Sequence, residues 1–217
     1  MIAKVLTFIF LLGLASNAYA GAPERIQLTP QASAHQFPFF DFLTPVWSYN
    51  GQIPGPVIKG RVGTTLTIDV VNHLKEPTSV HWHGLRIDNA MDGVPGVTQD
   101  PIAPGDRFTY RLNLQDAGTF WYHPHFNAGE QLERGLKGVL IVEEREKLPF
   151  SQDIVWLLDD WRFQKDGTIY PRFNTHPDLM HDGRWGNAIT INGQVKPVLV
   201  FKYGVEVFLC NYLVGIF

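Results

Sequence analysis

The chain has 217 residues, of which 18 are Lys or Arg and 21 are Asp or Glu, so its formal net charge is −3. This balance argues against a nucleic-acid-binding protein, which needs a basic face to displace phosphate counterions. Hydrophobic residues make up 45% of the chain, enough for a globular protein of one or two domains, and the single cysteine, Cys210, excludes an intramolecular disulfide framework and a multi-cysteine metal site.

The first 20 residues have the pattern of an export signal. Lys4 precedes an apolar stretch at residues 5–14, and an Ala-Tyr-Ala sequence at residues 18–20 matches a typical cleavage site. A membrane anchor is the alternative, but about ten apolar residues are too few to cross about 30 Å of hydrocarbon. Because no twin-arginine pair is present, we expect the general secretory route, a mature chain starting at Gly21, and an exported, periplasmic protein without a stable membrane span.

The mature chain has the pattern of an all-β protein. Runs rich in β-branched and aromatic residues, such as residues 64–71 and 107–112, recur between turn-forming Asn-Gly, Asp-Gly and Pro-Gly pairs. Strands separated by turn signals at this spacing are typical of a sandwich or barrel. No stretch has a long helical period, and neither a glycine-rich phosphate loop nor the G-x-S-x-G motif of serine hydrolases is present.

The strand pattern divides the mature chain into two parts. An apolar run at residues 138–142 closes the first part, and the charged residues 143–147 that follow predict a solvated linker. The expected organisation is a signal peptide at residues 1–20, a first domain at residues 21–147 and an incomplete second domain at residues 148–217. The second part ends on an apolar run, residues 207–217, which nothing further along the sequence would cover.

Two histidine pairs carry the chemistry. His81 and His83 flank Trp82, and His123 and His125 form a second pair with the same i and i+2 spacing. On a strand this spacing points both rings of a pair to one face and the residue between them to the other. Two such pairs in one β domain argue against isolated surface or hydrogen-bonded histidines. Four imidazoles without a nearby thiolate favour copper, with zinc as the alternative.

Further motifs accompany these pairs in a known order. They are N-G-Q-I-P-G-P at residues 50–56, H-W-H-G at 81–84, D-G-V-P-G-V-T-Q at 92–99, G-T-F-W-Y-H-P-H at 118–125 and G-L-K-G at 135–138. The series resembles the N-terminal domain of multicopper oxidases, the family of laccases, ascorbate oxidases and bacterial copper-resistance oxidases. L-D-D-W at 158–161 and I-N-G at 191–193 resemble the opening of the family's second domain. The resemblance implies a cupredoxin-like (plastocyanin-like) Greek-key β-sandwich followed by an incomplete second cupredoxin-like domain.

The resemblance also implies a role for each histidine of the two pairs in a three-copper cluster. His81 would bind the type 2 copper. His83 and His123 would share one type 3 copper, and His125 would bind the other. Asp92 matches an acidic residue that the family places near the cluster to supply protons, with a simple turn residue as the alternative. The implied reaction couples one-electron oxidation of a reducing substrate, which the sequence does not identify, to reduction of O2 to water.

Part of the family's machinery is not visible in this sequence. The family's cluster takes four histidines from its first domain and four from its last, and electrons enter through a His-His-Cys type 1 site. No His-Cys-His triplet occurs here, and no H-x-x-H-x-H motif follows His125. We therefore expect a chain that is inactive alone. It would be a truncated or frame-shifted product, which the apolar run at residues 207–217 favours, or a half-enzyme completed by another polypeptide.

Two other functional classes fit part of the pattern. A non-catalytic, exported cupredoxin module that binds copper or zinc would use the same four histidines without reducing O2. A cupin oxygenase also contains a double-histidine β motif, but it would require a Glu a few residues after the first pair. The sequence there is Leu-Arg-Ile-Asp, residues 85–88, which argues against the cupin.

Overall fold

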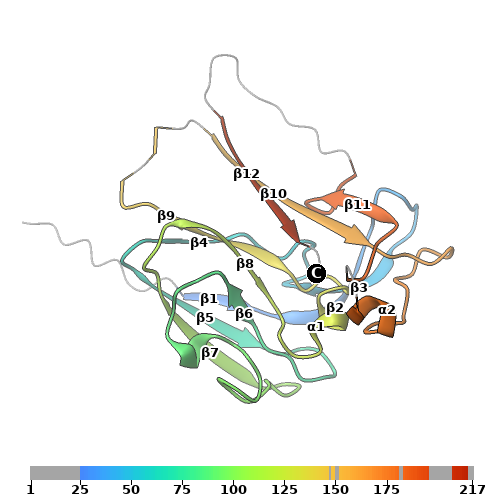
Figure 1. Ribbon diagram of the computed structural model, residues 1–217, viewed down its shortest axis with the longest axis horizontal. Coiled ribbons are helices and arrows are strands. Elements are labelled where there is room, and N and C mark those ends of the chain that lie inside the picture. The colour runs from blue at the N-terminus through green and yellow to red at the C-terminus, as the bar shows by residue number, and fades with distance from the viewer. Residues whose placement is uncertain (1–24, 147, 150–151, 181–182, 196–206, 215–217) are drawn as a thin grey trace, which may run out of the picture.

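The computed structural model describes residues 25–146, 148–149, 152–180 and 183–195, and the backbone of residues 207–214. The predicted signal peptide, residues 1–20, lies outside these residues, as does the side chain of Cys210. None of the helices in the described ranges is long and apolar enough to cross a membrane. Strands make up most of the regular structure, which confirms the all-β prediction (Figure 1).

Nine strands form the first part of the chain. They are β1 (Arg25–Leu28), β2 (Pro30–His35), β3 (Thr44–Tyr49), β4 (Ile58–Arg61), β5 (Thr65–Val71), β6 (His81–His83), β7 (Arg107–Asn113), β8 (Gly118–His123) and β9 (Gly138–Glu143). Three further strands follow, β10 (Gln152–Trp161), β11 (Ala188–Ile191) and β12 (Val207–Val214). The helices are short: the 3-10 helix η1 (Asn89–Met91), α1 (Ala128–Gln131) and α2 (His176–Met180).

The first nine strands form a β-sandwich. One sheet has the strand order β1-β5-β7 and the other β4-β9-β8-β6, while β2 and β3 pair as a separate two-stranded sheet. β1 runs parallel to β5 and β4 parallel to β9, so strands distant in sequence become neighbours. The sheets enclose one core with side chains from both, including Leu28, Ile58, Ile68, Trp82, Tyr110, Leu112, Tyr122 and Leu140. These observations confirm the predicted sandwich.

The alternation of side chains explains why β5 forms part of this sandwich. Leu66, Ile68 and Val70 point inward and are almost fully buried. Asp69 points outward, where its carboxylate accepts hydrogen bonds from the Arg25 guanidinium and from the Thr109 hydroxyl. Apolar residues at every second position are what a strand with one solvated face requires.

β9 is buried on both faces. Leu140 and Val142 point into the core of the sandwich, whereas Val139 and Ile141 pack against Leu157 of β10. Its continuous apolar sequence therefore reflects a strand covered on two sides. Glu143, the first residue of the predicted linker, belongs to β9 and pairs with Arg61 in the β4–β9 ladder.

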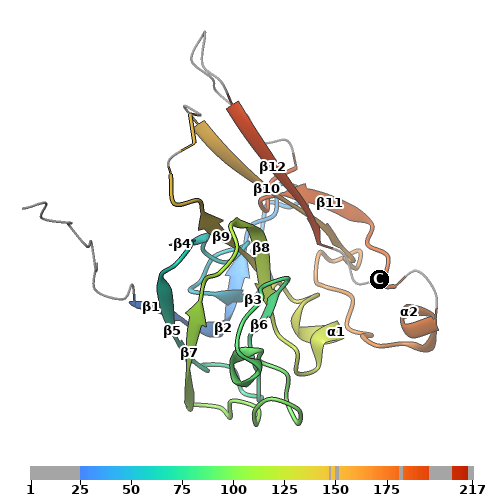
Figure 2. The same ribbon diagram turned by 60° about the vertical axis from the view of Figure 1, so that its left-hand side comes forward.

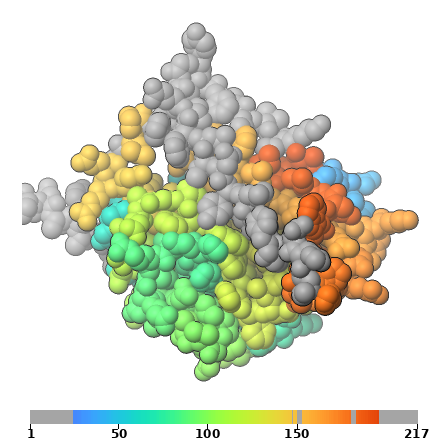
Figure 3. Space-filling model, in the orientation of Figure 1, coloured from blue at the N-terminus to red at the C-terminus, as the bar shows by residue number. Residues whose placement is uncertain are grey.

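The covering layer is a three-stranded sheet with the order β11-β10-β12. β12 runs parallel to β10, and β11 runs antiparallel to it. This β11-β10-β12 sheet, called the second sheet below, lies over the outer face of the β4-β9-β8-β6 sheet (Figures 1 and 2). In the space-filling view, the orange residues after residue 160 lie directly against the yellow-green residues around α1 (Figure 3).

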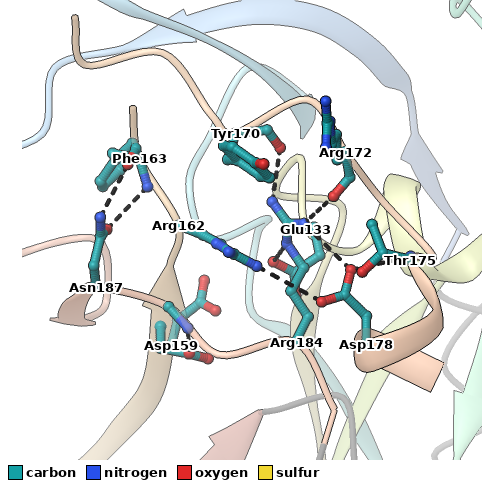
Figure 4. Close-up of polar contacts among 12 residues, drawn as sticks. Glu133, Asp159, Arg162, Phe163, Tyr170, Arg172, Thr175, Asp178, Arg184 and Asn187 are labelled. Carbon is teal, nitrogen blue, oxygen red and sulfur yellow. Dashed lines mark hydrogen bonds and ion pairs between the residues drawn. The ribbon is translucent and has the colours of Figure 1, made fainter. Parts of the chain in front are cut away.

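Buried charges connect the sandwich to the second sheet and the loops that follow it. The Lys137 ammonium contacts the Asp159 carboxylate of β10, and both side chains are at most 5% exposed. Nearby, the buried Arg184 guanidinium donates to Glu133 Oε2 at 2.9 Å. Arg184 also donates to the backbone carbonyl oxygens of Tyr170 and Arg172 (Figure 4). Each buried charge thus has an oppositely charged partner across the contact.

Candidate metal site

The β6–β8 ladder brings the two histidine motifs together. His81 lies opposite His123, and His83 lies opposite Trp121. Trp82, between the first two histidines, is fully buried in the core of the sandwich. The prediction that His81 and His83 share one face, with Trp82 on the other, is therefore confirmed.

In the second pair the two rings also lie together, with 6.3 Å between the His123 and His125 ring centroids, but His125 is not part of a strand. β8 ends at His123, so His125 lies beyond the strand. Pro124 has no backbone N–H to donate to a ladder, and β6 begins at His81, which leaves no strand partner for the following residues. The His125 ring nevertheless lies 5.4 Å from the His81 ring between centroids. Its backbone N–H donates to the Ser79 hydroxyl at 3.1 Å.

The four rings form one cluster around His81. The ring centroid of His81 is 5.7 Å from that of His83 and 5.3 Å from that of His123. One ring nitrogen each from His81, His83 and His123 lies within 4.8 Å of the others. Within the part of the chain that the structure describes, this is the only such group of three candidate metal ligands. His123 is buried, while His83 and His125 are exposed, so the cluster opens to solvent on one side.

Backbone carbonyls determine which nitrogens can bind a metal. His81 Nδ1 lies 2.7 Å from the carbonyl oxygen of Asp92, and His123 Nδ1 lies 2.8 Å from that of Pro124. A carbonyl oxygen only accepts, so each Nδ1 carries the proton and each Nε2 keeps its lone pair. His123 Nε2 is buried and has no hydrogen-bond partner. An acceptor in this state fits a metal ligand whose other nitrogen is fixed by the protein.

Burial favours the neutral form of two imidazoles of the cluster, His123 and His83. The pKa of His123 is lowered to about 3, mainly by burial; the neighbouring histidines act in the same direction, and the Pro124 carbonyl opposes them. Burial also lowers the pKa of His83, as do His81 and His125. Neutral imidazoles are the form that binds copper, so the residues present fit this metal.

Trp121 packs against two rings of the histidine cluster. Its ring stacks on the His123 ring at 4.1 Å between centroids and lies 5.0 Å from the His83 ring. Trp121 itself packs with Val139 and Leu157, so one indole connects the metal-binding face to the contact with the second sheet.

Asp92 lies beside His81. Its Oδ1 is 3.3 Å from His81 Nδ1, and its side chain is 33% exposed. The following residue, Gly93, has a φ of 76°, and a Cβ at this position would lie 1.8 Å from the Val80 carbonyl oxygen. Only glycine therefore allows this turn to bring the Asp92 carbonyl onto His81. Asp92 is thus both a turn residue and a neighbour of the cluster.

The sequence analysis did not single out Ser79 or Gln131. Both side chains are polar and buried next to the histidine motifs. Gln131 belongs to α1, and its side chain bonds to the segment that precedes β6. A single sequence contains no signal for a buried glutamine, because the same residue is common on exposed helix surfaces.

Comparison with known proteins decides the family. A family model described as multicopper oxidase matches residues 33–147, more than half of the chain. The chain belongs to the multicopper oxidase family. Members of this family bind copper and are built from cupredoxin-like sandwiches, which agrees with the observed fold and confirms the predicted fold class.

Individual multicopper oxidases show the same relationship. Copper resistance protein A of Escherichia coli is 38% identical over 131 residues, which cover 59% of this chain and 21% of the relative. Multicopper oxidase MmcO of Mycobacterium tuberculosis is 39% identical over 151 residues, which cover 68% and 28%. The crystal structure of a multicopper oxidase from Pseudomonas thermotolerans superposes with a TM-score of 0.81 at 37% identity, covering 88% of this chain and 47% of that one. The chain thus spans about a quarter of these curated relatives and about half of that structure.

Proposed function

We propose that this chain is the copper-binding N-terminal part of an oxidase that couples one-electron oxidation of a reducing substrate to reduction of O2 to water. The observation that carries the proposal is the convergence of ring nitrogens from His81, His83 and His123 within 4.8 Å in a chain of this family. Copper held by these residues would supply one-electron redox chemistry toward O2. The protein holds the ligands, fixes their tautomers and supplies protons.

The arrangement of the rings supports the family's division of ligands. His83 and His123 would share one type 3 copper; both rings lie next to the Trp121 ring, and their centroids are 5.8 Å apart. His81 faces Asp92 and would bind the type 2 copper. His125 would bind the second type 3 copper. These four histidines are half of the ligands that the family uses for its trinuclear cluster.

Asp92 would supply protons for the reduction of O2. Its carboxylate is partly exposed, so it can take a proton from water, and it lies beside a copper ligand. A carboxyl group in this position can hold the proton close to the place where oxygen is reduced.

The remaining ligands and the type 1 site would come from further domains or from a second polypeptide. Two of the four imidazoles, His83 and His125, are exposed on the open side of the cluster, where additional ligands can approach. We therefore propose that the isolated chain does not reduce O2. We also propose a signal peptide at residues 1–20 for export to the periplasm, a cupredoxin domain at residues 21–147 and a partial second domain at residues 148–217.

Oxygen consumption and metal content, measured together, test this function. The isolated chain should bind copper and consume no oxygen with a phenolic reductant. A His81→Ala, His123→Ala double variant should lose the metal. A His73→Ala, His176→Ala double variant, which removes two exposed imidazoles outside the cluster, should retain it. Unchanged metal content in the first double variant would refute the site.

The same experiment separates the main alternative, a non-catalytic copper- or zinc-binding module. Oxygen uptake by the isolated chain would contradict the proposed inactivity of this part alone. Preference for zinc over copper in a competition titration would favour the binding module, since a closed four-histidine zinc site leaves no position for a substrate.

A further inference from the structure

Pairing between strands does not account for the position of His125. The β6–β8 ladder fixes His81 and His83 relative to His123, but it ends at the His81–His123 pair. His125 lies two residues further on, after a proline and outside any strand. Something other than sheet hydrogen bonds must therefore hold its ring beside that of His81.

The contacts around His125 lead to the segment before β6. The backbone N–H of His125 donates to the Ser79 hydroxyl, and Ser79 lies two residues before His81. Six residues after His125, the side chain of Gln131 reaches the same segment from α1. Hydrogen bonds from His125 and from Gln131 therefore both reach the segment before β6, residues 76–79.

The Gln131 amide is bonded at both its nitrogen and its oxygen. Nε2 donates to Glu76 Oε1 at 2.7 Å and to the Pro77 carbonyl oxygen at 2.8 Å. Oε1 accepts from the Thr78 hydroxyl at 2.7 Å. Two acceptors and one donor determine which end of the amide faces which partner. The side chain is fully buried, so removal of the amide would remove all three of these hydrogen bonds at once.

The segment that receives these bonds is itself held firmly. Thr78 exchanges two backbone hydrogen bonds with Ile102, at 3.0 and 2.8 Å. The backbone N–H of Val80 donates to the buried Tyr110 hydroxyl at 3.1 Å. Hydrogen bonds to this segment can position His125 only if the segment itself is fixed, and these contacts fix it.

We propose that Ser79 and Gln131 are positioning residues that hold His125 next to His81, so that the fourth imidazole reaches the metal. This inference rests on the proposed copper site. Neither residue would touch the metal; both act through the backbone that carries His125. Loss of such outer contacts typically weakens metal binding by about 10- to 100-fold.

A double-mutant cycle on copper binding tests the proposal. The affinity of the full chain for Cu(II) alone is measured by competition with a chelator for the wild type, Gln131→Met, His125→Ala and the double variant. Gln131→Met should weaken Cu(II) binding about tenfold in the wild type and leave it unchanged in the His125→Ala background. The Cu(II) electron paramagnetic resonance spectrum of Gln131→Met should match that of His125→Ala.

Two further variants separate positioning from general destabilisation. Thr190→Val removes a buried hydrogen bond to Trp161 Nε1, far along the chain from the histidines, and should leave Cu(II) affinity unchanged. Ser79→Ala removes only the hydroxyl that accepts from the His125 N–H. It should weaken Cu(II) binding in the wild type and leave it unchanged in the His125→Ala background, as Gln131→Met does. If Gln131→Met does not fold, the Ser79→Ala cycle decides in its place.

The outcomes distinguish this inference from the proposed function. Equal loss of affinity in the wild-type and His125→Ala backgrounds, or no loss at all, would overturn the positioning role and leave the copper site intact. Equal Cu(II) affinity of the wild type and His125→Ala would likewise overturn the positioning role alone, whereas failure of the wild-type chain to bind Cu(II) would overturn the proposed function as well.

Discussion

The buried pair of Lys137 and Asp159 allows the contact between the sandwich and the second sheet to be tested. Both side chains are at most 5% exposed, and burial raises the pKa of Asp159 to about 6, against the opposing effect of the Lys137 ammonium. Lys137→Met removes the cation and leaves the carboxylate buried. Breaking a buried pair in this way costs about 3–5 kcal/mol of unfolding free energy.

Two comparisons isolate the effect of burial. A Lys137→Met, Asp159→Leu double variant removes both charges and should recover most of the loss, since replacing a buried pair with apolar groups is often neutral or stabilising. Arg86→Met breaks an ion pair with Asp116 in which the side chains are 68% and 50% exposed, and it should cost much less unfolding free energy than Lys137→Met, because water screens an exposed pair.

Urea unfolding followed by tryptophan fluorescence provides the assay. Trp161 is buried, and the Lys137 ammonium lies 5.1 Å from the centre of its ring, so its emission reports on this contact. A loss for Lys137→Met no larger than that for Arg86→Met would refute the reasoning. A double variant as unstable as Lys137→Met would also do so, because the buried lone carboxylate would then not be the cause.

Three other predictions concern pH, colour and the N-terminus. The loss in Lys137→Met should shrink between pH 8 and pH 5. The pKa of Asp159 is higher in the folded than in the unfolded chain, so the folded state takes up the proton first and acidification favours it; equal losses at both pH values in urea unfolding would contradict this. The chain titrated with Cu(II) should show no intense blue band in its visible spectrum, because such a band needs a cysteine thiolate with histidine partners, and a deep blue solution would reveal a type 1 site. N-terminal sequencing of periplasmic material should begin at Gly21, and an intact Met1 on a cytoplasmic protein would contradict the export signal.

Periodicity alone predicted the parts of the fold in which one strand face is buried. The His81-Trp82-His83 spacing predicted one shared face from the two-residue repeat of a strand, and this is confirmed; the strand β5 was expected from the β-branched run at residues 64–71 and is also present. His125 departs from the repeat because Pro124 ends the ladder, so its place depends on contacts distant in sequence. No local pattern predicts contacts of that kind.

The buried charges were also beyond the reach of sequence patterns. Lys137 and Glu133 stand in a polar stretch that is typical of an exposed loop, yet both are buried against partners from a later part of the chain. The apolar run at residues 138–142 did contain a signal, because apolar side chains at successive positions indicate a strand covered on both faces. The identity of the covering layer follows only from the packing of Leu157 on that strand.

β9 makes the first β-sandwich dependent on the second sheet for its stability in water. Because Val139 and Ile141 depend on the second sheet for cover, a sandwich cut away after residue 146 would present an apolar stripe to water and tend to associate with other copies. Trp121 belongs to the same stripe and stacks on His123, so loosening of the second sheet would disturb a proposed copper ligand through one aromatic ring. The second sheet contributes no histidine to the cluster, yet it supports the face of the sandwich that carries the histidines.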